Sequence, residues 1–216
     1  MPSNRRRFLK KAGLYGIGTV AGLAALPSKT PRVLSPDDGI PRLETLPELA
    51  ARGETPIEED ATPFAVWHYK HERSGFRATA PINVVFLLDG ADEDLEDVMA
   101  VLDEIGWYRS PEEYTRYAWN YHEDRFEVQH ATAAETLFGN VGRHHVRCWQ
   151  FGNTVSMQAH EDSPGFPRHT IESYESTRTL IERLYGVRGW SVASAALDFG
   201  NGKDPDHDGH VTVIEP

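Results

Sequence analysis

Residues 143–162 read RHHVRCWQFGNTVSMQAHED, and this stretch decides the fold class. Residues 143–151 and 154–161 each alternate between polar and apolar side chains, which is typical of strands in an antiparallel sheet. Gly152 and Asn153 stand between the two segments, and a glycine-containing dipeptide in that place predicts a two-residue hairpin turn. We therefore predict an antiparallel hairpin over about residues 143–161.

The short turn also predicts the register of the hairpin. It pairs Phe151 with Thr154, and on one face it places Cys148 opposite Met157. Cys148 is the only cysteine of the chain, so the chain forms no intramolecular disulfide. Because its neighbours on this face are apolar, we expect a buried, packing role for Cys148.

The other face of the hairpin is polar in this register. Its opposed pairs are His145 with His160, Arg147 with Gln158, and Arg143 with Asp162. Opposed residues have Cβ atoms about 4.5–5.5 Å apart, so two imidazoles there can share a metal ion or flank a phosphate. This predicts a catalytic or zinc-like metal site of His145, His160, Asp162 and Arg147, with His169 as a further metal ligand. The alternative is a solvent-facing polar strip, or histidines held in place by Asp162 and Glu161.

Working outward from the hairpin, further patterns predict strands and helices in alternation. The continuous apolar run at 83–88 predicts a central strand buried on both faces. Strands are also expected near 64–71, 126–130, 190–199 and 210–215, and helices over 95–105, from Ser110 through 121, and near 173–185. The prediction is therefore an α+β fold: a single domain with a mixed β-sheet and about three helices. In the first strand, His68 and His71 should face opposite sides, which makes them a poor pair of metal ligands.

The N-terminus resembles a twin-arginine signal, with Arg5 and Arg6 as the pair and Phe8-Leu-Lys10 following. The weakly apolar stretch at 12–26 is too short for a membrane span, which needs about 20 residues. We assign residues 1–28 to this signal, 29–62 to a proline-rich acidic linker, and 63–216 to the folded domain. The implied partner is the twin-arginine translocase, and the implied location is outside the cytoplasmic membrane, extracellular or at the cell surface. A stable membrane span is expected only if the signal stays uncleaved.

The charge balance is strongly acidic outside the signal. The whole chain has a formal net charge of −11; residues 1–30 hold six basic and no acidic residues, so the remainder carries 16 − 33 = −17. Such a charge repels nucleic acid and anionic membranes, which argues against both as partners. It is tolerable where salt shortens the Debye length to about 3 Å, which indicates a halophilic protein, the alternative being an ordinary acidic mesophilic one.

The C-terminal segment contains a calcium-loop pattern. Asp204, Asp206, Asp208 and Gly209, with Glu215 at the twelfth position, match the letters of an EF-hand loop. Residues 211–214 read as a strand, however, which makes Glu215 a doubtful ligand. We predict a calcium-binding turn of the three aspartates, the alternative being an acidic turn before a terminal strand.

Two short His-x-Thr motifs form a separate pattern. His130-Ala-Thr132 and His210-Val-Thr212 resemble the paired motifs of two-histidine phosphoesterases, in which both histidines act on one phosphodiester. That reading requires His130 and His210 to lie close together in the fold.

Residues 63–216 as a whole resemble the LssY C-terminal domain family. The resemblance rests on residues 81–88, 143–149 and 155–162, on His169-Thr-Ile171, and on the closing segment at 208–213. The chain would be a free-standing, exported version of a domain otherwise attached to membrane modules. The family has no established activity, so the resemblance implies a fold and no mechanism. We predict an exported accessory or ligand-binding domain, and as the alternative a metal- or histidine-dependent hydrolase of phosphorylated or lipid-derived substrates.

Overall fold

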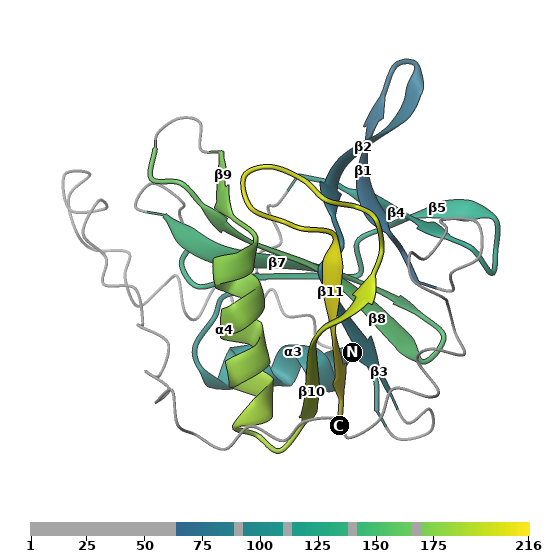
Figure 1. Ribbon diagram of the computed structural model, residues 1–216. Coiled ribbons are helices and arrows are strands. Elements are labelled where there is room, and N and C mark those ends of the chain that lie inside the picture. Colours follow the sequence, from purple (N-terminus) through teal and green to yellow (C-terminus); the bar gives the residue numbers. More distant parts are fainter. Residues whose placement is uncertain (1–63, 89–92, 110–113, 138–141, 166–169) are drawn as a thin grey trace, which may run out of the picture.

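The computed structural model of the chain describes residues 64–88, 93–109, 114–137, 142–165 and 170–216. This part is one domain with two β-sheets and two helices (Figure 1). The strands are β1 (Trp67–Glu72), β2 (Gly75–Pro81), β3 (Val84–Leu87), β4 (Tyr117–Asn120), β5 (Arg125–Val128), β6 (Ala131–Ala134), β7 (Arg143–Phe151), β8 (Thr154–Asp162), β9 (Ile171–Ser173), β10 (Ser191–Asp198) and β11 (His210–Glu215). The helices are α3 (Leu95–Glu104) and α4 (Glu175–Gly186).

The larger sheet has seven strands in the order β10-β11-β3-β8-β7-β6, with β9 paired to the end of β8. β11 and β3 run parallel, and the other pairs of this sheet are antiparallel. The predicted α+β class with a mixed sheet is therefore confirmed. The prediction of a central buried strand at 83–88 is also confirmed, because all four residues of β3 are buried between β11 and β8.

Both helices pack on one face of this sheet. Val98, Met99 and Leu102 of α3 and Ile181 and Leu184 of α4 share a buried apolar cluster with sheet residues of β3, β7 and β8. α3 begins at Asp94, whose side chain accepts from backbone N–H groups of the first turn while Asp97 caps in return. The helices expected over 95–105 and 173–185 are thus confirmed.

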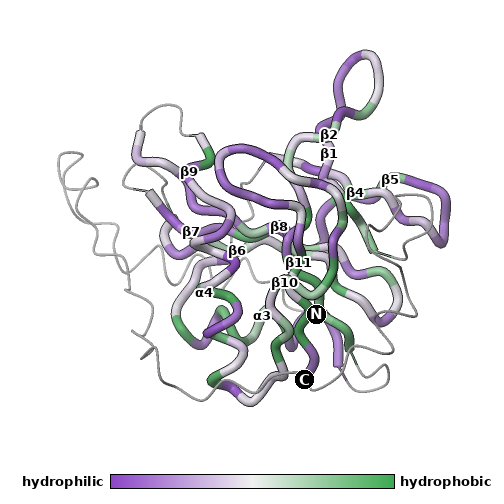
Figure 2. The backbone as a smooth tube through the Cα atoms, viewed as in Figure 1, coloured by the Kyte–Doolittle hydropathy of each residue, from purple (hydrophilic) through white to green (hydrophobic). Residues whose placement is uncertain are grey.

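The opposite face of the large sheet is covered by residues 64–66 and by the smaller sheet. Trp149 and Phe151 of β7 and Val85 and Leu87 of β3 belong to this second buried cluster. Figure 2 shows hydrophobic segments in the body of the domain, whereas the β1–β2 tip, the β4–β5 end and the loop between β10 and β11 are hydrophilic. β7 and β8 are therefore covered on both faces.

The smaller sheet has the order β2-β1-β4-β5 and is antiparallel throughout. Here one prediction is wrong: the helix expected from Ser110 through 121 is replaced at Tyr117–Asn120 by strand β4. Ala118 and Asn120 are buried while Tyr117 and Trp119 are only partly so, and this period of two suits a strand. The capping pattern at 110–113 lies outside the described residues. The described part therefore holds two helices, where about three were expected.

Candidate functional site

The polar face of the β7–β8 hairpin has the predicted register. His145 pairs with His160, Arg147 with Gln158, and Arg143 with Asp162. These side chains do not form a solvent-facing strip, because His145 is only 1%, His160 4% and Asp162 3% exposed. The expectation of an exposed strip assumed one open face for the hairpin. The smaller sheet covers that face, so the polar residues lie inside the domain.

A hydrogen-bonded chain runs through the outer end of this face. His160 Nε2 lies 3.1 Å from Asp162 Oδ1, and Arg143 Nε donates to Asp162 Oδ2 at 3.0 Å. On the other side of the ring, Gln158 Nε2 lies 2.9 Å from His160 Nδ1. Both ring nitrogens of His160 and both oxygens of Asp162 thus have partners. Burial lowers the pKa of His160, although the Asp162 carboxylate opposes this shift.

His145 completes the opposed histidine pair. Its ring centroid is 5.0 Å from that of His160, with the ring planes at 83°. Burial is the largest cause that holds the pKa of His145 well below its ordinary value, followed by the charge of Arg147. His145 is therefore a neutral imidazole at pH 7.

His68 of β1 is a member of this cluster that the sequence did not reveal. Its side chain is 3% exposed, and its ring meets Trp149 edge-on at a centroid distance of 6.0 Å. Burial and then the charges of Arg147 and Arg116 lower its pKa well below the ordinary value. Strand alternation placed His68 and His71 on opposite sides, but it could not show that β1 brings His68 against Trp149, which lies on the same face of β7 as His145 and Arg147. We call His68, His145, Arg147, His160 and Asp162 the hairpin cluster.

The hairpin cluster allows two kinds of ligand. One ligand atom each from His145, His160 and Asp162 lie within 4.8 Å of one another, which is close enough to hold a metal ion. A cation there would replace the His160–Asp162 contact and would stand beside Arg143 and Arg147. An anion would instead be attracted by both arginines. His169, the further ligand expected from the sequence, lies outside the described residues.

Cys148 faces the helices, away from the hairpin cluster. It is fully buried, and its Sγ lies 3.9 Å from Met99 Sδ. Burial raises the pKa of its thiol, so Cys148 stays protonated at neutral pH. The prediction of a packing role is confirmed.

The three C-terminal aspartates of the predicted calcium turn have different surroundings. Asp206 accepts from Ser173 Oγ at 2.5 Å and from Tyr174 N at 2.7 Å, which ties the loop to the start of α4. Asp208 Oδ1 accepts from His210 N at 2.9 Å, while Asp204 is exposed. Glu215 pairs with Ser191 at the far end of β11, so Glu215 does not reach the turn.

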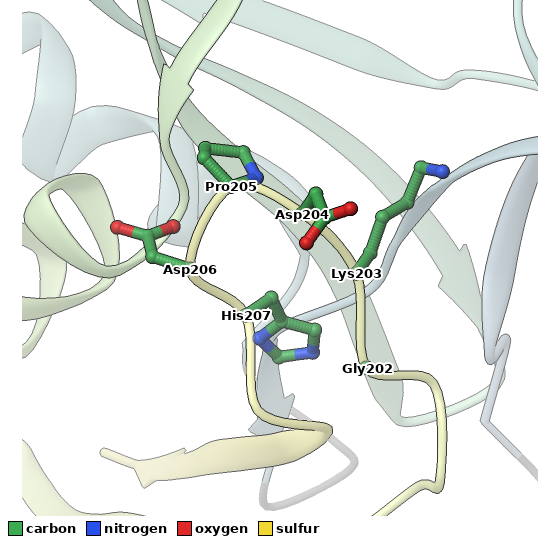
Figure 3. Close-up of a pocket in the computed structure, with 6 residues that line it drawn as sticks. All are labelled: Gly202, Lys203, Asp204, Pro205, Asp206 and His207. Carbon is green, nitrogen blue, oxygen red and sulfur yellow. The ribbon is translucent and has the colours of Figure 1, made fainter.

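The same loop lines an open surface pocket of about 380 Å³ (Figure 3). It is lined by Gly202, Lys203, Asp204, Pro205, Asp206 and His207. A second group able to hold a metal ion adjoins it, made of Glu175, His207 and Asp208. The calcium-loop pattern contained Asp208 but did not count His207 as a ligand. It missed Glu175 because that residue lies in the first turn of α4, far away in the sequence.

The two-histidine reading is wrong. His130 directly precedes β6, at one edge of the large sheet, and His210 begins β11. Strands β3, β8 and β7 lie between β11 and β6. The two histidines therefore cannot act on one phosphodiester.

Comparison with protein-family models, with curated proteins and with solved structures gave no match. Neither described helix is long and apolar enough to cross a membrane. The signal and linker assigned to residues 1–62 lie outside the described residues. The resemblance to the LssY C-terminal domain family stays a prediction.

Proposed function

We propose that this chain is an exported accessory domain that binds a small anionic group, phosphate or carboxylate, in the hairpin cluster. The observation that carries the proposal is the gathering of Arg143, Arg147 and neutral histidines on one buried face of the hairpin, where Asp162 is the one carboxylate of β7 and β8 on that face. Asp162 already balances Arg143 through their 3.0 Å contact. Arg147 adds a second positive charge at the same place.

The pKa directions agree with an anionic ligand. Among the charged groups, Arg147 has the largest effect on the pKa of His68 and on that of His145, and it lowers both. A positive field that disfavours imidazolium favours an anion placed among the same groups. Neutral imidazole N–H groups then donate to the ligand beside the guanidinium of Arg147.

The contacts of the hydroxyl and thiol groups of the hairpin support a ligand-binding role for the cluster and argue against covalent catalysis by these groups. Ser156 Oγ accepts from Ala65 N at 3.2 Å, and Thr154 Oγ1 donates to Phe151 O at 2.8 Å. Cys148 lies on the helical face with a raised thiol pKa. These groups are therefore held in packing roles and are not aimed at the cluster as nucleophiles.

The predicted export route fits a buried ligand site. Twin-arginine signals direct proteins that fold before export, so a ligand enclosed by the two sheets would travel with the domain.

The second candidate function is a histidine-dependent or metal-dependent hydrolase. The observation that favours it is the close approach of His145, His160 and Asp162, in which Asp162 orients the His160 ring. In that case the cluster would bind Zn²⁺ in preference to phosphate.

Titration of the purified chain with inorganic phosphate in high salt tests the proposal, with binding followed by calorimetry and thermal shift. Arg147→Gln should weaken phosphate binding about 10- to 100-fold, since a charged hydrogen bond contributes about 1.5–3 kcal/mol. Arg147→Lys keeps the charge and should lose less. Arg125→Gln, which removes an arginine 60% exposed on the smaller sheet, is the matched control and should bind like the wild type.

Two results would contradict the anion proposal. One is phosphate binding that Arg147→Gln leaves unchanged. The other is Zn²⁺ binding that is lost in the His145→Ala/His160→Ala variant while phosphate has no effect, and this result would favour the hydrolase.

A further inference from the structure

His207 is held by one neighbour in a single tautomer. Asn201 is fully buried, and its Nδ2 donates to Val66 O at 2.8 Å and to Ile82 O at 2.9 Å. These two bonds to carbonyl groups fix the orientation of the Asn201 amide, because only the NH₂ end can donate. Asn201 Oδ1 then faces His207 Nε2 at 2.9 Å and must accept a hydrogen bond from its N–H group.

When His207 carries a single ring proton, that proton is on Nε2 and the Nδ1 atom carries a lone pair. This atom faces Glu175 Oε1 at 3.4 Å, longer than the roughly 2.7–2.9 Å of a charge-assisted hydrogen bond. The His207 side chain is fully buried, so water does not separate the two acceptors from that side. A cation that both the lone pair and the carboxylate oxygen can bind would satisfy the two acceptors together.

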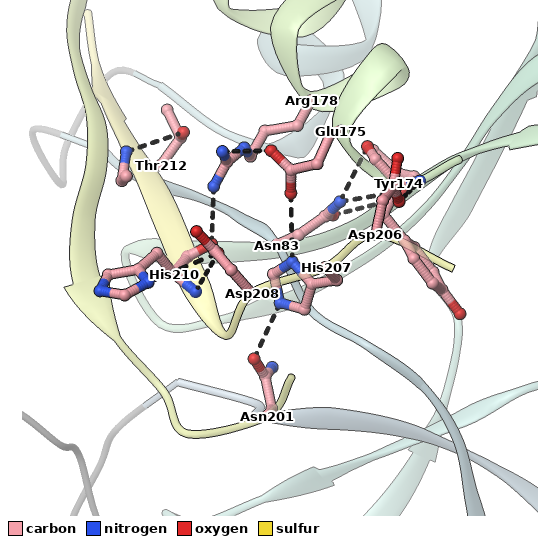
Figure 4. Close-up of polar contacts among 12 residues, drawn as sticks. Asn83, Tyr174, Glu175, Arg178, Asn201, Asp206, His207, Asp208, His210 and Thr212 are labelled. Carbon is pink, nitrogen blue, oxygen red and sulfur yellow. Dashed lines mark hydrogen bonds and ion pairs between the residues drawn. The ribbon is translucent and has the colours of Figure 1, made fainter. Parts of the chain in front are cut away.

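Asp208 brings a second carboxylate to the same point. The ligand atoms of Glu175, His207 and Asp208 all lie within 4.8 Å of one another (Figure 4). Arg178 forms an ion pair with the other oxygen of Glu175, Oε2, and donates to His210 O at 2.8 Å. Two carboxylates and one guanidinium leave the group with a net negative charge.

We propose that Glu175, His207 and Asp208 form a binding site for a divalent transition-metal ion such as Zn²⁺, independent of the hairpin cluster. His207 would bind through Nδ1 while its Nε2–H donates to Asn201, the arrangement in which a second neighbour orients a ligating histidine. The imidazole ligand favours zinc over calcium, which takes oxygen ligands. Side-chain exposures of 28% for Glu175 and 59% for Asp208 leave the outer side open for water as a further ligand.

The loop that carries His207 and Asp208 is anchored on both sides of the site. Asp206 holds it to Ser173 and Tyr174, at the start of α4. Gly209 has φ +97°, and an added Cβ would lie 3.3 Å from the backbone N of Gly202. Glycine suits this backbone and this close approach within the loop, while Asp206 holds the loop next to the start of α4.

Metal analysis after dialysis against Zn²⁺ in high salt tests the proposal, with Co²⁺ absorption as a spectroscopic substitute. The wild type should retain one ion per chain at this site, and Glu175→Gln and Asp208→Asn should each lose it. Asp204→Asn, on the same loop and exposed, is the matched control and should keep the ion. The His145→Ala/His160→Ala variant should keep it as well, which separates this site from the hairpin cluster.

Nitrogen-15 NMR of the histidine rings gives a second readout that does not depend on variants. In metal-free protein His207 should show a protonated Nε2 and a bare Nδ1, and Zn²⁺ should shift the Nδ1 resonance. The proposal is overturned if His207 is doubly protonated at neutral pH and does not respond to Zn²⁺. It is equally overturned if the wild type retains no ion, or if Glu175→Gln and Asp208→Asn bind Zn²⁺ as the wild type does.

Discussion

His145 and His160 lie directly opposite each other in the β7–β8 hairpin, with ring centroids 5.0 Å apart and both side chains almost fully buried. Because both rings are buried, they are not part of a polar surface of the domain. Gln158 and Asp162 form hydrogen bonds with the two ring nitrogens of His160. The charge of Arg147 helps to lower the pKa of His145. This arrangement makes the stability of the domain sensitive to each charged member.

Asp162→Asn should strongly destabilise the domain. Arg143 is 7% and Asp162 3% exposed at the side chain, and the substitution removes the buried negative charge to which Arg143 Nε donates. Breaking such a pair costs about 3–5 kcal/mol. The free energy of unfolding from chemical denaturation measures the loss. Glu123→Gln breaks the exposed pair with Arg125 and should cost about 0–1 kcal/mol. If both variants lost the same free energy of unfolding, the expected difference between the buried and the exposed ion pair would be refuted.

The domain should lose stability as the pH falls below about 6.5. Burial and then Arg147 hold the pKa of both His68 and His145 below that ordinary value. The unfolded chain therefore binds protons below pH 6.5 that the folded chain does not, which favours unfolding. Each histidine held neutral contributes a slope of about 1.4 kcal/mol per pH unit, until the pH falls below its folded pKa. Denaturation curves over a pH series measure this slope. His68→Gln should make it shallower, and an unchanged slope would contradict the assignment to His68.

Cys148 should not react with thiol reagents in the folded protein. It is fully buried, and its raised pKa keeps it protonated. A disulfide reagent added to native protein should label almost no thiol, while denatured protein should show one thiol per chain. Rapid labelling under native conditions would mean that the helical face opens readily.

Asp206→Ala should destabilise the loop between β10 and β11 more than Asp204→Ala does. Asp206 accepts from Ser173 and from the Tyr174 backbone, and loss of these bonds costs about 1–3 kcal/mol. Asp204 is exposed on the same loop and provides a control of equal charge and size. Thermal unfolding monitored by circular dichroism compares the two variants, and equal midpoints would show that Asp206 does not anchor the loop.

Much of the large sheet could be predicted because its signals are local. The β7–β8 register follows from a two-residue turn, and β3 follows from a continuous apolar run. Strand β4 could not be predicted in the same way. Its short alternation at Tyr117–Asn120 follows a helix-capping pattern, and pairing with β1 and β5 decides the conformation of those four residues.

The candidate sites divide along the same line. The sequence by itself determined that His145, His160 and Asp162 share one face with Arg147, because side-chain direction alternates with a period of two along a strand. Only the tertiary structure decided that this face is buried, that His68 joins it from β1, and that Glu175 meets His207 across 32 positions of the chain. Those contacts arise when separate elements pack together, and no local pattern of residues encodes which distant element will cover a polar face.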